Sequence, residues 1–198
     1  MEDFRSIIVK KEGTKKLVIN NPTQFDLIGQ GAQGAVFRLS EDRCVKIYAQ
    51  ENYRIAESNA LKTAEESKIV PKIHEVGANY IVMDYIKGPP LGNYLRTVNF
   101  LPVSITKQLL FVLQEMERIG FKKIDCSLRH LLLTDQGELK LIDHVHSINK
   151  ERAVPVDLFK GLSKLKLLDQ FLYQVKELDP NQFSKWMDGL FTIFKNIR

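Results

Sequence analysis

Three glycines and the strand that follows them have the spacing that phosphate binding requires. Gly29, Gly31 and Gly34 form a G-x-G-x-x-G pattern in the segment IGQGAQGAVF. Glycines let the backbone turn tightly and bring its amide N–H groups close to phosphate oxygens. A dinucleotide-binding fold needs a helix directly after the glycines, but residues 35–39 read as a strand. No Gly-Lys-Ser/Thr sequence ends the pattern, so a P-loop is also excluded.

One lysine and two aspartates elsewhere in the chain lie at distinct points of the predicted pattern. Lys46 lies in the strand-like segment CVKIY, and Asp125 and Asp143 flank a hairpin-like segment far along the chain. Asp143 ends an apolar strand in LKLIDH, where burying a carboxylate without a partner is costly.

The first half of the chain is predicted to be rich in strands. Residues 25–48 read as strand, glycine turn, strand, tight turn and strand, because residues 35–39 and 44–48 alternate in polarity around a turn at 40–43. A helix is predicted over 51–68, limited by Pro71, and short strands over 72–76 and 80–85. The breaker cluster KGPPLG at 87–92 predicts the boundary between two lobes.

The second half is predicted to be helical, with one hairpin. Apolar residues recur at helical spacing from Ile105 to Ile119, and again from Val156 to Leu178. Residues 131–134 and 138–142 predict a hairpin across the turn DQG, and a last helix spans about 181–196. The pattern predicts an α+β protein of two lobes, residues 1–86 and 87–198, that together form one domain. Residues 1–20 could be an added strand, a lid or a docking arm.

Composition narrows the setting in which the chain works. No apolar run approaches the roughly 20 residues of a membrane-spanning helix, and residues 1–20 show no secretory signal. Two cysteines cannot form a disulfide framework, so a cytoplasmic location is expected. The net charge of +5 comes from scattered lysine pairs without a nucleic-acid module, so no nucleic-acid partner is expected.

From Phe25 to Asp157 the sequence resembles the protein kinase superfamily. The glycine pattern, the strand lysine, and the segment GFKKIDCSLRHLLLTDQGELKLIDHVHS occur in family order. The resemblance is to compact or atypical bacterial serine/threonine-protein kinases. It implies a two-lobed protein kinase-like fold with a truncated helical C-terminal lobe, ATP as the phosphate donor, and Mg or Mn as the metal.

In the first lobe, the resemblance implies a set of nucleotide-binding residues. Lys46 would contact the phosphates and be held by Glu57, with Glu65 and Glu66 as competitors for that role. Ala60, Leu61 and Ala64 share a helical face with Glu57 and favour it. The nucleotide-binding residues implied by the resemblance are Gly29, Gly31, Gly34, Val36, Cys44, Lys46, Glu57, Met83, Asp84, Ile86 and Leu132. Among them, Cys44 stands where the family has an alanine over the adenine, and Met83 is the gatekeeper. Residues 84–86 would offer backbone groups to the adenine, and Leu132 would form the floor beneath it.

In the second lobe, the resemblance implies the catalytic and metal-binding residues. Asp125 would accept the proton of the substrate hydroxyl, and Asp143 would hold the metal against the phosphates. Arg129 lies where tyrosine kinases place an arginine and could compensate for Ser127, which replaces a lysine. His130 stands where the family has an asparagine that binds metal.

The sequence also departs from the family. Lys123 replaces the histidine two residues before Asp125, and the metal-binding turn reads Asp-His-Val instead of Asp-Phe-Gly. Imidazole suits manganese or zinc better than magnesium, so His130 predicts greater activity with manganese. A zinc site is an alternative; its candidate ligands are His130, Asp143, His144 and His146.

Three functions remain open at this point. The chain could be an active protein kinase, a pseudokinase acting as a nucleotide-binding or scaffold module, or a kinase of small-molecule hydroxyl groups. No Ala-Pro-Glu segment follows Asp143, which favours a compact kinase without an activation-loop switch. Asp157 could brace the catalytic loop or cap a helix.

Overall fold

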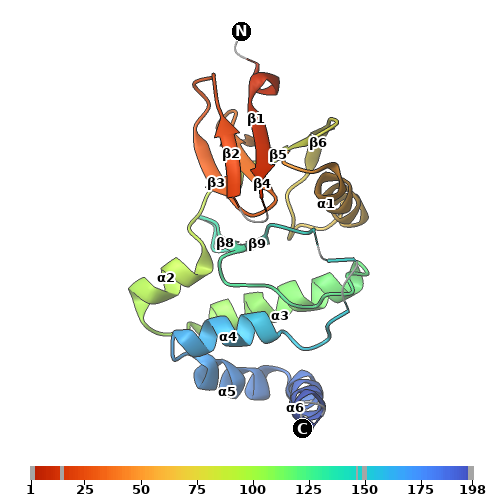
Figure 1. Cartoon of the computed structure of the whole chain (residues 1–198). Helices are drawn as coiled ribbons and strands as arrows, with labels where there is room; N and C mark the ends of the chain where they lie inside the picture. Colours follow the sequence, from red (N-terminus) through yellow and green to blue (C-terminus); the bar gives the residue numbers. More distant parts are fainter. Residues whose placement is uncertain (1–2, 14–15, 146, 149–150, 196–198) are drawn as a thin grey trace. The chain divides into compact units, whose positions relative to one another are not determined.

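The computed structural model describes residues 3–13, 16–145, 147–148 and 151–195. The chain divides into two compact units. The first unit comprises Met1–Glu66 and Val70–Ile86, and the second comprises Ser67–Ile69 and Lys87–Arg198. Strands dominate the first unit and helices dominate the second (Figure 1). The fold class is therefore mixed α+β, with the sheet in the N-terminal part, as the sequence predicts.

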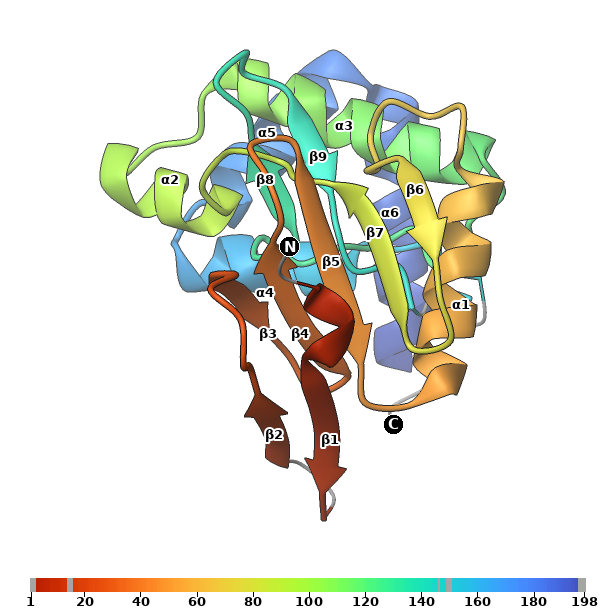
Figure 2. The same ribbon diagram turned by 90° about the horizontal axis from the view of Figure 1, so that it is seen from above.

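The first unit contains a five-stranded antiparallel sheet. Its strands lie in the order β3-β4-β5-β7-β6 (Figure 2). Their bounds are β3 Leu27–Gln30, β4 Gly34–Arg38, β5 Arg43–Tyr48, β6 Ile73–Val76 and β7 Tyr80–Asp84. The central strand β5 has buried residues on both faces. Because side chains alternate along a strand, Val45 and Ile47 share one face while Lys46 and Tyr48 share the other.

An N-terminal hairpin covers the Val45 and Ile47 face of the sheet. It consists of the short 3-10 helix η1 (Phe4–Ser6), β1 (Ile8–Glu12) and β2 (Lys16–Asn20), and β1 pairs antiparallel with β2. Its apolar side chains join one buried cluster with those of β4 and β5. The cluster contains Phe4, Ile7, Val9, Leu17, Ala35, Phe37, Val45, Ile47 and Val82. Residues 1–20 therefore supply part of the hydrophobic core.

Helix α1 (Glu51–Thr63) packs against β5, β6 and β7, and it is shorter than the sequence predicts. The predicted helix ran to residue 68, but the observed one ends at Thr63. The chain leaves the helix because Ser67 and Ile69 are bound in the second unit. The Ser67 hydroxyl donates to Glu115 at 2.7 Å, and the Ile69 carbonyl accepts from the Leu141 N–H at 2.6 Å.

The second unit consists of five helices and a small hairpin among the described residues. The helices are α2 Leu91–Val98, α3 Val103–Arg118, α4 Val156–Lys164, α5 Leu168–Leu178 and α6 Pro180–Lys195. The predicted hairpin is formed by β8 (Leu131–Leu133) and β9 (Leu139–Leu141). Phe159, Phe171 and Trp186 bring α4, α5 and α6 together through aromatic contacts, with ring centroids 5.4 to 6.1 Å apart.

Two sequence predictions for this unit are wrong in detail. The single helix predicted over 156–178 is two helices, which break where Lys166 adopts a left-handed conformation with φ of 59°. The apolar periodicity continues through the break because both helices bury a face, so it could not reveal the turn. Helix α2 was not predicted, since it begins inside the breaker cluster at 87–92.

Among the described residues, no helix has both the length and the apolar character needed to cross a membrane.

The glycine pattern supplies a matched stability test. A Cβ on Gly34 would lie 2.3 Å from the Ile47 carbonyl oxygen on the neighbouring strand, whereas a Cβ on Gly31 would meet nothing within 4 Å. Gly34→Ala should therefore lower the free energy of unfolding by about 1–3 kcal/mol, because the backbone of β5 must shift. Gly31→Ala should change it by less than about 0.5 kcal/mol. Urea unfolding of both variants measures the difference, and equal losses would show that the close approach at Gly34 is not tight.

Candidate functional site

The glycine turn joins β3 to β4, and its glycines have different structural roles. The Gly31 N–H donates to the Gly34 carbonyl at 3.0 Å, and the Ala49 N–H holds the turn by donating to the Gln33 carbonyl at 3.0 Å. Gly29 lies opposite Val36 in the β3–β4 ladder. Gly34 is needed for close packing of two strands, whereas the open space around Gly31 leaves room for a ligand against the backbone.

Lys46 of β5 and Glu57 of α1 form an ion pair on the face of the sheet opposite the N-terminal hairpin. The Lys46 Nζ lies 2.5 Å from the Glu57 Oε2, and the Tyr48 hydroxyl donates to the same oxygen at 2.9 Å. Glu57 is only 1% exposed. A buried carboxylate is costly unless charge and hydrogen bonds compensate it, so this pair fixes the position of the ammonium group.

Helix geometry explains why Glu57 takes this place. Glu57 lies on the face of α1 that also buries Ala60 and Leu61. Glu65 and Glu66 lie beyond the end of the helix and are exposed. Tyr48 was missed by the sequence analysis, although its spacing of two from Lys46 on a strand places both side chains on one face.

Three of the residues predicted to surround an adenine, Val36, Cys44 and Met83, lie on β4, β5 and β7 of the first unit. Cys44 faces Met83 across the β5–β7 ladder, and both are buried. Burial raises the pKa of the Cys44 thiol to about 12, so this cysteine is an apolar packing group and not a nucleophile. Val36 pairs with Lys46 across the β4–β5 ladder.

The backbone of Asp84 is already engaged within the first unit. Its N–H donates to the Lys72 carbonyl at 3.0 Å, and its carbonyl lies 3.5 Å from the Cys44 Sγ. Its carboxylate binds the His74 ring at 2.6 Å and accepts from the Lys72 N–H at 3.0 Å. These bonds leave Asp84 less suited to bind a base than the sequence analysis expects. Ile86, two residues further, is half-buried.

In the second unit, the side chain of Asp125 is fully buried and its carboxylate is bound from several directions. Arg152 Nη1 donates to Oδ2 at 2.7 Å, and the backbone N–H groups of Asp157 and Leu158 donate at 2.9 to 3.2 Å. Those N–H groups belong to the first turn of α4, where the helix dipole favours a negative charge. Burial raises the pKa of Asp125, and Arg152 and the two backbone donors oppose that rise.

This arrangement anchors the Asp125 loop to the segment before α4. The Ile124 N–H donates to the Arg152 carbonyl at 2.7 Å, and the Arg152 N–H donates to the Lys122 carbonyl at 2.9 Å. The Asp125 carboxylate replaces the missing cap of α4, because Pro155 occupies the cap position without a side-chain bond.

Asp157 is the second residue of α4, and Pro155 occupies the cap position. The alternative that Asp157 caps this helix is therefore wrong. The Asp157 carboxylate lies 3.0 Å from Arg152 Nη1 and 3.4 Å from Lys123 Nζ. These ion pairs lower the pKa of Asp157. The contact with Lys123 links α4 to the Asp125 loop, and the sequence pattern gave no indication of Arg152.

Asp143 and His130 lie next to each other in the second unit. Asp143 lies two residues after the end of β9 and adopts a left-handed conformation with φ of 66°, which is strained for a residue other than glycine. Its Oδ2 lies 3.5 Å from His130 Nε2. Arg129 Nε donates to the same nitrogen at 3.0 Å, and since an arginine N–H can only donate, this bond requires an unprotonated Nε2.

The two side chains offer a mixed donor set for a divalent ion once Arg129 releases His130 Nε2. A carboxylate oxygen and an imidazole nitrogen 3.5 Å apart are close enough to bind one ion, and that donor set favours manganese over magnesium. Among the described residues no group of three His, Cys, Asp or Glu side chains could hold a metal. His144 is buried with its Nε2 bound to the Leu141 carbonyl at 3.0 Å, and His146 lies outside the described residues.

Leu132 and Ser127, which the sequence analysis also singled out, lie near Asp125 and His130 in the sequence. Leu132 is half-buried in β8, where it forms a bridge with Pro90 and pairs with Lys140 of β9. The His130 N–H donates a hydrogen bond to the Ser127 carbonyl at 2.9 Å, and this bond shapes the turn between Asp125 and β8.

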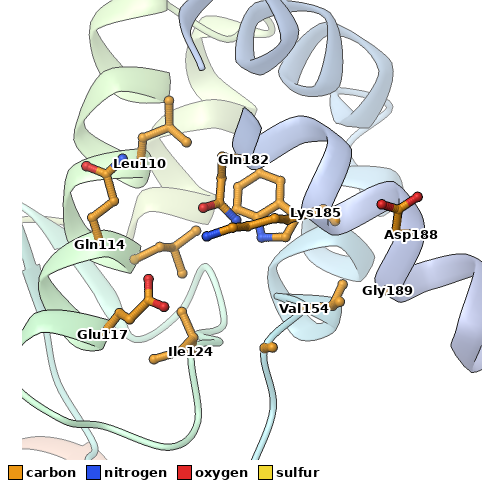
Figure 3. Close-up of a pocket in the computed structure, with 12 residues that line it drawn as sticks. Leu110, Gln114, Glu117, Ile124, Val154, Gln182, Lys185, Asp188 and Gly189 are labelled. Carbon is orange, nitrogen blue, oxygen red and sulfur yellow. The ribbon is translucent and has the colours of Figure 1, made fainter. Parts of the chain in front are cut away.

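A cavity of about 450 Å³ in the second unit involves none of the predicted site residues (Figure 3). It is lined by α3, α6 and the segment before α4. The Lys185 side chain extends from α6 towards α3, where Gln114 and Glu117 lie. Its lining carries charges of both signs, so it does not select a ligand by charge.

Comparison with known proteins shows a similarity to a protein with a kinase name. The chain is 28% identical over 143 residues to the protein named "Putative serine/threonine-protein kinase YrzF" of Bacillus subtilis (strain 168). The match covers 70% of this chain and 66% of the relative, so the chain spans just under two thirds of that protein's length. No protein-family model matches the chain. The similarity supports a kinase-like relationship, with which the mixed α+β fold is compatible.

The buried charge at Asp125 gives a pH-dependent stability prediction. Arg152→Ala should lower the free energy of unfolding by about 1–3 kcal/mol at neutral pH, because it leaves a buried carboxylate without its cation. Removing Arg152 raises the folded-state pKa of Asp125 further above its ordinary value of 3.8. In the folded variant, Asp125 therefore keeps its proton to higher pH than in the wild type. The free energy of unfolding of the variant falls relative to the wild type as the pH rises from the unfolded-state pKa of Asp125 through its folded-state pKa.

Urea unfolding from pH 4 to 8 measures this effect. Asp125→Asn is the control background, in which Arg152→Ala should cause a stability loss that changes much less with pH, because the buried carboxylate is gone and only the partly exposed Asp157 remains beside Arg152. If Arg152→Ala lowered the free energy of unfolding by the same amount at every pH from 4 to 8, the role assigned to the Arg152–Asp125 pair would be wrong.

Proposed function

We propose that the chain is an ATP-dependent phosphotransferase of the serine/threonine protein kinase type, which moves the γ-phosphate of ATP to a hydroxyl group. The observation that carries this proposal is the ion pair of Lys46 with buried Glu57, beside a glycine turn on the same sheet. The similarity to a protein named as a serine/threonine kinase supports the same reading.

In this proposal the first unit binds the nucleotide. The Lys46 ammonium contacts the phosphates, and Glu57 and Tyr48 hold it so that little side-chain entropy is lost on binding. Backbone N–H groups of the turn after Gly31, whose own N–H is bound to the Gly34 carbonyl, face the phosphates in this proposal. Val36, Cys44 and Met83 provide apolar surface for the adenine, with backbone groups near Ile86 as its polar partners.

The second unit supplies the metal-binding and hydroxyl-positioning groups in this proposal. Asp143 and His130 hold a divalent ion. When bound, such an ion neutralises charge on the phosphate oxygens. Arg129 would have to release His130 Nε2 for that nitrogen to bind an ion, because one lone pair cannot serve both. Asp125 would orient the acceptor hydroxyl of a protein or a small molecule.

A second candidate function is a nucleotide-binding scaffold without transfer activity. It is favoured by one observation, the complete burial of the Asp125 side chain beneath Arg152 and the first turn of α4. A carboxylate held in this way cannot reach a substrate hydroxyl. The active-kinase proposal therefore requires that Arg152 and the segment before α4 move away from Asp125 during turnover.

Phosphate transfer from γ-labelled ATP, with Mg²⁺ or Mn²⁺ and a generic protein substrate, tests the proposal. Lys46→Met should lower transfer by about 100-fold or more, because a positioned charge on the phosphates is lost. Asp143→Asn should lower it similarly, whereas Lys10→Met, an exposed strand lysine, should leave it unchanged. Transfer that survives in Lys46→Met would refute the proposal.

Thermal denaturation separates the two candidate functions. ATP at about 100 times its dissociation constant adds about 2.7 kcal/mol of stability to a protein that binds it. A stabilisation by ATP that Lys46→Met abolishes, together with no transfer by the wild type, would favour the scaffold. Neither transfer nor stabilisation would contradict both candidates.

The donor set at His130 predicts a metal preference. Transfer should be greater with Mn²⁺ than with Mg²⁺, and His130→Asn should reverse the order because the new oxygen ligand suits Mg²⁺. The electron paramagnetic resonance signal of free Mn²⁺ measures binding without any reaction, and His130→Ala should weaken binding about 10-fold. Unchanged Mn²⁺ binding in His130→Ala would show that the imidazole is not a ligand.

A further inference from the structure

A second hollow in the second unit, of about 420 Å³, is distinct from the proposed catalytic residues. It lies along the outer face of α3, between that helix, the segment Ser67–Ile69 and strand β9. We call it the α3–β9 groove. Its accessible side chains are Lys68, Ser104, Lys107, Gln108, Phe111, Glu138 and Lys140. None of the residues assigned to nucleotide, metal or hydroxyl binding contributes to it.

The walls of the α3–β9 groove are held together by hydrogen bonds. The Leu141 N–H donates to the Ile69 carbonyl at 2.6 Å, and the Leu139 N–H donates to the Gln108 side chain at 3.4 Å. Lys140 Nζ donates to the Lys68 carbonyl at 2.8 Å. The outer edge of β9 is thus tied to both neighbouring elements, and the groove is formed before any partner binds.

The groove combines positive charge with one exposed aromatic ring. Three lysines and a single acid, Glu138, line it, and Glu138 is paired with Lys140 at 2.8 Å. Lys68 and Lys107 therefore supply the excess charge, and both are exposed. Phe111 is 51% exposed although it is a large apolar side chain on a regular helix. A single exposed apolar side chain is common on protein surfaces, but here Phe111 borders a groove with excess positive charge, and this combination offers both an apolar anchor point and charge selectivity.

We propose that the α3–β9 groove docks an acidic segment of a partner protein through an apolar side chain that packs on Phe111. Charge complementarity with Lys68 and Lys107 selects carboxylates on either side of that apolar residue. Single-stranded nucleic acid is a poorer fit, because successive bases stack on several aromatic side chains and the groove presents one. The surface is separate from the residues assigned to transfer, so the proposal stands or falls without the proposed activity.

Fluorescence polarisation of a labelled peptide tests the proposal on the whole chain. The probe is a ten-residue peptide of Asp and Glu with a central Leu-Phe pair. Two comparison peptides replace that pair by Ala-Ala or by Glu-Glu. The probe should bind, and each comparison peptide should bind at least about fivefold more weakly, since anchors in a pocket carry most of the affinity.

Two surface variants locate the binding site, each with a matched control on α5. Lys107→Glu and Phe111→Ser should each weaken probe binding at least about fivefold. Lys176→Glu makes the same charge change at an exposed lysine, and Tyr173→Ser removes an aromatic ring that is 67% exposed. Both controls should change the dissociation constant by less than twofold. All four positions are exposed, and circular dichroism checks that the variants fold.

Three results would overturn the proposal. Equal weakening by Lys107→Glu and Lys176→Glu would mean that net charge alone attracts the probe. If the all-acidic peptide bound as tightly as the Leu-Phe probe, an apolar side chain packed on Phe111 would not contribute to binding. The third result is that the protein binds a polyuridine oligonucleotide but not the peptide. If Phe111→Ser also abolished that binding, the groove would be assigned to nucleic acid instead.

Discussion

The buried carboxylate of Glu57 is the constraint on which the first unit depends. A carboxylate at 1% exposure must be compensated, and here one ammonium and one phenol provide that compensation. Both donors come from β5, so α1 must lie against this strand. The N-terminal hairpin covers the other face of β5 and leaves the Lys46 face to α1. Buried ion pairs often add no stability over a well-packed apolar pair, so a task for the ammonium beyond folding gives this arrangement a reason.

The second unit uses a buried carboxylate in a different way. Glu57 holds a cation that keeps 13% of its side chain exposed, whereas the Asp125 carboxylate is enclosed by donors from Arg152 and α4. The first arrangement presents a charge, and the second fixes a loop to a helix. Asp143 and His130 differ again, because both remain partly exposed and the backbone at Asp143 is strained. Strain of this kind persists where the surrounding structure requires it, and often at functional sites.

Sequence reasoning succeeded where a single element determines the position of a side chain. Glu57 follows from one helical face, and the pairing of strands around the glycine turn follows from alternation. It failed where the partner is distant and carries no pattern. The enclosure of Asp125 depends on Arg152, 27 residues away, and on backbone donors that no sequence displays. The break at Lys166 was hidden because the apolar spacing of α4 continues into α5. The engaged backbone of Asp84 likewise depends on Lys72, the residue before the neighbouring strand β6.

The central claim is that Lys46, held by Glu57, is a phosphate-binding group. Nuclear magnetic resonance of ¹⁵N-labelled lysine ammonium groups tests it directly, with the Lys46 signal assigned by its loss in Lys46→Arg. Addition of a non-hydrolysable ATP analogue with a divalent ion should shift the Lys46 signal and leave that of exposed Lys10 in place. In Glu57→Gln the ammonium should exchange with water faster and its signal should broaden, because its buried anchor is gone. A Lys46 signal that does not move at saturating nucleotide would contradict the account.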